Sequence, residues 1–164
     1  MKVYRKLVLC ALGIILMIGS ALAADFKSFT SESGEATEAL DCRNPKITSA
    51  SFGMGELYGC VQGNAETVKW FINEVPNTGR VDNVKLMWND WFKDVGYGLH
   101  ADKQKAEQAL KALIQMYAPN KEEEVEEAFW GNSHRTIASD GFVLEYTYSR
   151  GPAIDERLIV VTEE

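Results

Sequence analysis

The first 23 residues constrain the rest of the chain most, because they show the three zones of a secretory signal peptide. A basic segment over residues 1–6 is followed by twelve apolar residues, and Ala21 and Ala23 then form the small-residue pattern that signal peptidase reads. Twelve helical residues cover about 18 Å, which is short of the roughly 30 Å hydrocarbon core of a bilayer. We therefore predict cleavage after Ala23 and export to the periplasm or the outside of the cell. An uncleaved membrane anchor is the alternative.

The exported part of the chain is strongly acidic. The whole sequence has a formal charge of −7, and the leader holds Lys2, Arg5 and Lys6 but no acid, so cleavage takes the charge to −10. Phosphate backbones and anionic lipids repel such a chain. We therefore expect neither nucleic-acid binding nor stable membrane association once the leader is removed.

Cleavage leaves two of the three cysteines, Cys42 and Cys60. An even pair in an exported chain is typical of a disulfide, because the compartment is oxidising. The spacing is not that of a redox-active Cys-x-x-Cys pair. The sequence therefore predicts a structural bridge that stabilises the fold by about 3 kcal/mol.

The polar, small residues of 24–41 lack a sustained apolar period, so they predict a flexible arm that precedes one domain over 42–164. Two short strands are expected at 47–52 and 57–62, with a turn at the glycines between them. The i, i+3, i+4, i+7 spacing of apolar residues predicts a helix over 65–75.

Residues 81–92 fit both strand and helix periods, and their Val and Trp content favours a strand through Trp88. That strand would complete a β-α-β start to the domain. The alternative, a helix over the same residues, stays open because Val84, Trp88 and Trp91 also fit helical spacing.

The second half of the domain predicts a helical pair and then strands. We expect one helix capped by Asp102 and running to Tyr117, and a second over 120–130 with Asn120 and Glu123 as a capping box.

The pair Asp140-Gly141 predicts a hairpin between strands at 134–139 and 142–149. An apolar last strand over 158–162 is expected in the centre of the sheet. The predicted fold class is α+β, with about three helices on one face of a mainly antiparallel sheet.

The candidate chemistry lies near His100. A carboxylate that fixes its tautomer would make it a general base, and Asp102 two residues on is the nearest in sequence. Alternatively, His100 is half of a metal site completed by Asp90 or His134. The simplest interpretation is that Asp102 caps the helix and His100 lies in a surface loop. Because no clustered ligand motif is present, we expect no metal and no cofactor.

Aromatic residues are the most distinctive local feature. Trp88 and Trp91 flank a polar amide and Asp90, and Tyr97 follows closely. Such residues are enriched at interfaces and also build cores. On a strand the two indoles fall on opposite faces, so one of them would be available to a partner.

No catalytic motif is present: there is no serine elbow, and both remaining cysteines are expected to be paired. We therefore predict a non-enzymatic binding module, such as an inhibitor, immunity or accessory protein, that acts on another exported protein. The alternatives are a small-ligand or metal binder, and an envelope hydrolase that uses His100 with a nearby carboxylate. The candidate binding residues are Trp88, Asp90, Trp91, Tyr97, His100 and Asp102.

Overall fold

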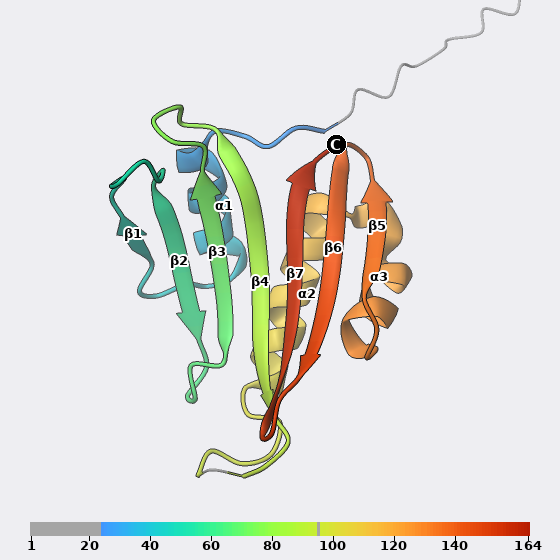
Figure 1. Cartoon of the computed structure of the whole chain (residues 1–164). Coiled ribbons are helices and arrows are strands. Elements are labelled where there is room, and N and C mark those ends of the chain that lie inside the picture. Colours follow the sequence, from blue (N-terminus) through green and yellow to red (C-terminus); the bar gives the residue numbers. More distant parts are fainter. Residues whose placement is uncertain (1–23, 95) are drawn as a thin grey trace, which may run out of the picture.

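Seven antiparallel strands form one sheet, and three helices cover one of its faces (Figure 1). The computed structural model describes residues 24–94 and 96–164, so the predicted signal peptide lies outside the described residues. In chain order the elements are α1 (Phe29–Ala39), β1 (Lys46–Thr48), β2 (Leu57–Gln62), β3 (Val68–Glu74), β4 (Val81–Trp91), α2 (Lys103–Tyr117), the 3₁₀ turn η1 (Pro119–Lys121), α3 (Glu122–Trp130), β5 (Arg135–Ser139), β6 (Phe142–Arg150) and β7 (Ile154–Glu163).

The strand order is β1-β2-β3-β4-β7-β6-β5, so the last strand of the chain lies in the middle of the sheet. Every neighbouring pair is antiparallel. In Figure 1 the helices lie behind the sheet, and the opposite face is turned towards the reader. The structure thereby confirms the predicted α+β class and the single domain.

The core lies between the sheet and the helices. On β3, Val68, Trp70 and Ile72 are buried, while the residues between them point to the other face, as the pleat of a strand requires. A stripe on α2 meets them from the helical side; its largest members are Leu110, Leu113, Ile114 and Tyr117. Burial of these side chains is the main force that holds the two layers together.

The predicted helix over 65–75 is wrong, because these residues form β3. Its apolar positions fit a helical period, but the buried ones alternate, and the strand hydrogen-bonds to β2 on one side and β4 on the other. Short apolar runs fit both periods, and the pairing partners decide between them. The predicted β-α-β start is therefore also wrong, and the chain instead runs through four antiparallel strands, β1 to β4.

The predicted arm over 24–41 is wrong for the eleven residues of α1. Ser28 caps this helix by accepting a hydrogen bond from the Ser31 amide at 3.3 Å. The helix buries Phe29 and Ala36 in the core, and its buried Glu32 carboxylate accepts a hydrogen bond from the Tyr117 hydroxyl at 2.8 Å. Small residues that gave little periodic signal thus allow a close approach to the sheet.

The remaining elements were predicted with the right type. Residues 81–91 form a strand, β4, which settles the ambiguity and extends the element three residues beyond Trp88. The two C-terminal helices, the hairpin at Asp140-Gly141 and the central last strand are confirmed. The predicted caps are wrong: neither α2 nor α3 has a side-chain cap, and Asn120 donates instead to the Asp140 carboxylate at 2.7 Å.

The predicted disulfide between Cys42 and Cys60 is present and joins the segment after α1 to β2. It fits an extracellular location. Within residues 24–94 and 96–164, no helix is both long enough and apolar enough to cross a bilayer.

Candidate functional site

His100 pairs with Asp90 rather than with Asp102. The ring nitrogen Nδ1 of His100 lies 2.7 Å from Asp90 Oδ1. Asp90 is the last residue but one of β4. Its side chain is only 8% exposed, whereas the His100 side chain is 54% exposed. The His100 amide also donates to the Trp91 carbonyl at 2.7 Å, which fixes the loop against the end of the strand. The Asp90 carboxylate thus fixes the orientation of the His100 ring through Nδ1, while about half of the His100 side chain is exposed to solvent.

A buried arginine lies on the other side of the same carboxylate. Arg157 Nε on β7 is 3.7 Å from Asp90 Oδ2. Its Nη1 donates to the carbonyl oxygens of Phe129 at 2.9 Å and Gly131 at 2.6 Å, at the C-terminal end of α3. The negative end of a helix dipole attracts such a cation. Asp90 and Arg157 therefore tie β4, β7 and α3 together, which gives both residues a structural role that the sequence did not reveal.

The chemistry open to His100 is that of an oriented acid–base group. A carboxylate on Nδ1 leaves Nε2 free to exchange a proton with a bound molecule. Asp90 is the polar side chain that the structure brings to the ring; no serine, cysteine or lysine of the described residues hydrogen-bonds to it. Nor do the described residues contain a cluster of three or more His, Cys, Asp or Glu side chains suited to a metal, and His134 precedes β5 without joining His100.

Asp102 supports the turn between β2 and β3. Its carboxylate accepts hydrogen bonds from the backbone amides of Asn64 at 2.8 Å and Ala65 at 3.1 Å, and from the Thr67 hydroxyl at 3.0 Å. A Cβ on Gly63 would lie 2.0 Å from this carboxylate, so the turn needs glycine there. The predicted pairing of Asp102 with His100 is thus replaced by a structural contact across the fold.

The aromatic residues of the predicted site are separated by the strand. Trp88 is buried, packs edge-on against Trp130 at 5.7 Å between ring centroids, and donates its indole N–H to the Ala101 carbonyl at 3.1 Å. Trp91 is half-buried on the opposite face of the sheet. Tyr97 lies in the loop after β4 and is 64% exposed. Trp88 therefore belongs to the core, whereas Trp91 and Tyr97 reach the surface at different places.

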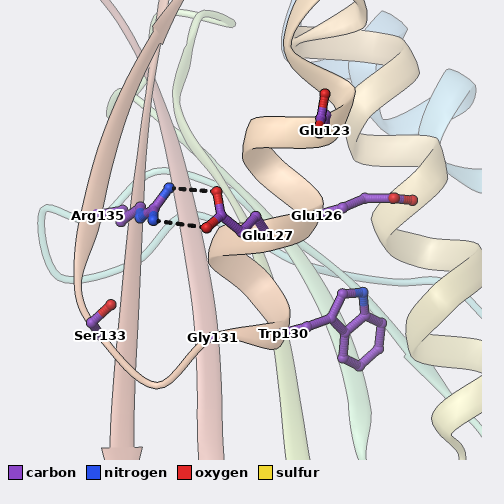
Figure 2. Close-up of a pocket in the computed structure, with 7 residues that line it drawn as sticks. All are labelled: Glu123, Glu126, Glu127, Trp130, Gly131, Ser133 and Arg135. Carbon is purple, nitrogen blue, oxygen red and sulfur yellow. Dashed lines mark hydrogen bonds and ion pairs between the residues drawn. The ribbon is translucent and has the colours of Figure 1, made fainter.

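A hollow of about 540 Å³ lies between α3 and β5 (Figure 2). Glu127 and Arg135 form a two-point ion pair across it, with donor–acceptor distances of 3.1 and 3.2 Å. Figure 2 shows Trp130 and Glu126 pointing away from this pair, and both line a second hollow together with residues of α2. The hollow is open, and its only basic lining residue is already paired, so its side chains do not converge on one point as those of a ligand cleft do.

The most exposed large apolar side chain of the described residues is Phe52, at 100%. It lies at the tip of a two-residue turn, in which the Ser51 amide donates to the Met54 carbonyl at 3.2 Å and the Met54 amide donates back at 2.9 Å. Both central residues have positive φ, 51° at Phe52 and 79° at Gly53, as a type I′ turn requires. We call residues 51–54 the Phe52 tip.

The base of the Phe52 tip is held firmly to β3. A Cβ on Gly55 would lie 2.2 Å from the Glu74 carbonyl oxygen, so only glycine permits this approach. The Glu74 carboxylate accepts hydrogen bonds from the amides of Glu56 and Gly79, each at 2.7 Å. These donors hold the pKa of the Glu74 carboxyl below its usual range. One side chain thus fixes the base of the tip and the neighbouring β3–β4 turn.

A hollow of about 470 Å³ separates the tip from the sheet; its lining includes Met54, Leu57, Asn73, Pro76 and Lys85. The predicted strand over 47–52 is wrong beyond Thr48, where β1 ends, and Phe52 is a central residue of the turn. The sequence does contain one indication of this turn: Phe52 precedes Gly53, at a position where type I′ turns usually have asparagine or aspartate.

Comparisons of the chain with protein-family models, with curated proteins and with solved structures gave no match.

Proposed function

We propose that this protein is an exported, non-enzymatic binding module that acts on another extracytoplasmic protein, with the Phe52 tip as its anchor. The observation that carries the proposal is the fully exposed Phe52 at φ 51°. The disulfide supports the location, and the braced base of the tip supports a rigid binding element. The module would present one aromatic side chain to a pocket on its partner.

The stability of the fold does not account for Phe52. A left-handed backbone costs a non-glycine residue roughly 1–2 kcal/mol, and asparagine, aspartate or glycine relieve that cost. Burial normally compensates for a large side chain in a strained place, but Phe52 has none. A residue that costs stability and gains no packing points to a role outside the folded chain.

A rigid exposed aromatic suits protein recognition. Aromatic side chains supply many of the residues that dominate binding energy, and they do so in pockets that exclude water. Holding the turn in its bound shape reduces the entropy that association loses. Met54, the last residue of the same turn, is 63% exposed and adds a second apolar side chain to the tip. The matching partner surface is an apolar pocket on a protein, because the acidic chain is repelled by anionic membranes.

The test begins with photo-crosslinking from a benzoylphenylalanine at position 52 of the oxidised, processed protein in its native extract. The same probe at Lys111, exposed on α2, is the control for random encounters. The crosslinked protein is then identified, purified and titrated with the native chain, with Phe52→Asn and with Tyr97→Ala.

We expect Phe52→Asn to weaken binding by about 30-fold or more, since truncation of an anchoring aromatic costs about 2 kcal/mol or more. Tyr97→Ala, which removes the other highly exposed aromatic, should change affinity by less than about threefold. If the effects were reversed, the binding surface would lie in the loop after β4 and the Phe52 tip would lose its role. Equal affinity of all three chains would reject both surfaces.

The second candidate function is an acid–base reaction at His100, favoured by the 2.7 Å contact with Asp90. In this hydrolase hypothesis the exposed nitrogen of His100 accepts a proton from an attacking water. A screen of the oxidised protein against peptide, ester and glycoside substrates tests it, with His100→Gln as the variant that keeps the Asp90–Arg157 pair. Any turnover that His100→Gln leaves unchanged would exclude this reaction.

A further inference from the structure

The face of the sheet that the helices leave uncovered, here called the open face, has an apolar centre (Figure 1). Strand register places Met87 on β4 directly opposite Leu158 on β7, and Phe71 and Val160 lie in the next row. All four side chains are partly accessible to solvent. The described chain therefore presents an apolar patch across β3, β4 and β7, a feature that usually marks an interaction surface.

Charges divide the open face into two halves. Lys69 on β3 and Lys85 on β4 lie on one side of the boundary between β4 and β7. Glu145 on β6 and Glu156 on β7 lie on the other side. Register puts Phe71, Lys85, Val160 and Glu145 in one row and Lys69, Met87, Leu158 and Thr147 in the next. Within residues 24–94 and 96–164, none of the four charged side chains has an ion-pair partner.

We infer that the open face binds a second copy of this chain. A two-fold axis parallel to the strands and centred between β4 and β7 would place each β4 over the partner's β7, and each β3 over the partner's β6. This rotation brings the lysine half of one copy over the glutamate half of the other, twice. A surface that complements itself in this way is what a symmetric dimer requires.

The size of the open face suits this arrangement. Seven strands about 4.8 Å apart span about 29 Å, and strands of 9–11 residues are about 30 Å long. Allowing for the shorter outer strands, the face covers roughly 700 Å², close to the roughly 800 Å² per partner of a standard interface. Two such sheets would stack about 10 Å apart, with Met87 and Leu158 of both copies at the centre.

The split charge favours a second copy over an unrelated protein. An unrelated partner would need only an apolar patch, and a face of a single charge sign would serve it equally well. Here the two signs lie on opposite sides of the boundary between β4 and β7, so one rotation brings both lysines over the glutamate half of the partner. The Phe52 tip borders the open face, since Met54 and Lys85 line the same hollow. Phe52 itself does not line that hollow and is fully exposed, so its role can be tested separately.

Sedimentation equilibrium of the oxidised chain over residues 24–164 tests the inference. We expect the native chain to dimerise. Lys85→Glu places a negative charge over the partner's glutamate half at two symmetry-related positions and should weaken the dimer by about tenfold or more. Glu145→Lys places a positive charge over the lysine half and should have the same effect. The double variant Lys85→Glu with Glu145→Lys exchanges the signs and should restore the native dissociation constant to within about threefold. Lys111→Glu, on α2, is the matched control.

A chain that stays monomeric up to about 1 mM, where an association of only about −4 kcal/mol would already be half complete, overturns the inference. So does a dimer that neither single reversal weakens, since it would use another face. Recovery in the double variant also shows that the single variants fold. Phe52→Asn should leave the dimer unchanged, so this inference and the proposed function can fail separately.

Discussion

Two hairpin turns in this protein share one backbone conformation but differ in the residue at the first central position. Phe52-Gly53 and Asp140-Gly141 are both two-residue turns with positive φ at both positions, 51° and 79° in the first and 44° and 99° in the second. Aspartate tolerates this conformation, and the Asp140 carboxylate also accepts a hydrogen bond from Asn120. Phe52 tolerates it poorly and contacts solvent alone. The comparison shows that the stability of the fold explains an aspartate at position 140 but does not explain a phenylalanine at position 52.

The two turns are also held in different ways. The Asp140 turn joins β5 to β6, and five register pairs continue from it into the sheet. The Phe52 tip has a single bridge between Ser51 and Met54, and it lies in the loop closed by Cys42 and Cys60. The disulfide and the hydrogen bond to the Glu74 carboxylate thus hold the Phe52 tip in place, whereas the paired strands β5 and β6 hold the Asp140 turn.

Reduction of the disulfide should produce the largest difference in stability between the two turns. Opening the Cys42–Cys60 loop should lower the free energy of unfolding by about 3 kcal/mol, because the unfolded chain gains entropy. We expect hydrogen exchange to accelerate more at the amides of 51–54 than at those of 139–142. Denaturant unfolding with and without reductant measures the first effect. Equal acceleration at both turns would show that the bridge stabilises the whole domain and not the tip.

Giving the Asp140 turn the residue of the other turn should destabilise the protein. Asp140→Phe adds a left-handed phenylalanine and removes the hydrogen bond from Asn120, for a loss of about 2 kcal/mol in unfolding free energy. Asp140→Asn keeps the tolerance for positive φ and should stay within about 0.5 kcal/mol of the native chain. Chemical denaturation of both variants checks this, and a neutral Asp140→Phe would contradict the strain argument for Phe52 as well.

The reverse exchange should stabilise the protein. Phe52→Asn relieves the left-handed strain and removes no packing, so the unfolding free energy should rise by about 1 kcal/mol. Phe52→Ala keeps the strain of a side chain at positive φ and should gain less. Thermal and denaturant melts of the two variants make the measurement. A loss of stability in Phe52→Asn would mean that Phe52 supports the fold after all.

Acid should loosen the tip before the other turn, and this is the smallest effect. The hydrogen bonds from Glu56 and Gly79 lower the pKa of the Glu74 carboxyl below its ordinary value of 4.5. A lowered pKa means that the contribution of Glu74 is complete above pH 4.5 and is lost as the pH falls further. Exchange at 51–56 should therefore rise on acidification, relative to 139–142. Glu74→Gln should remove this pH dependence, and an unchanged pH dependence in that variant would point to another group.

The candidate site could be predicted only in part. His100 and Asp90 were both named from the sequence, but their pairing was not, because ten residues and a loop separate them and Asp102 is closer along the chain. Asp102 was expected to cap α2, and it caps a turn that begins 39 residues earlier at Gly63 instead. A carboxylate bonds to whichever amides the fold brings near, and distance along the chain does not reveal them. Phe52 was assigned to the end of a predicted strand over 47–52, because an apolar aromatic before glycine fits a strand end as well as a turn.

The sequence by itself determined the features whose cause is local. The Asp-Gly pair predicted the hairpin at Asp140-Gly141, and an unbroken helical period predicted α2. The even number of cysteines after the predicted leader predicted the disulfide. Only the tertiary structure decided that residues 68–74 pair as a strand between β2 and β4, and that the weakly periodic α1 belongs to the core. The physical reason is that hydrogen-bond partners and burial depend on residues far away in the chain, so a short segment with two possible periods takes the one that its neighbours complete.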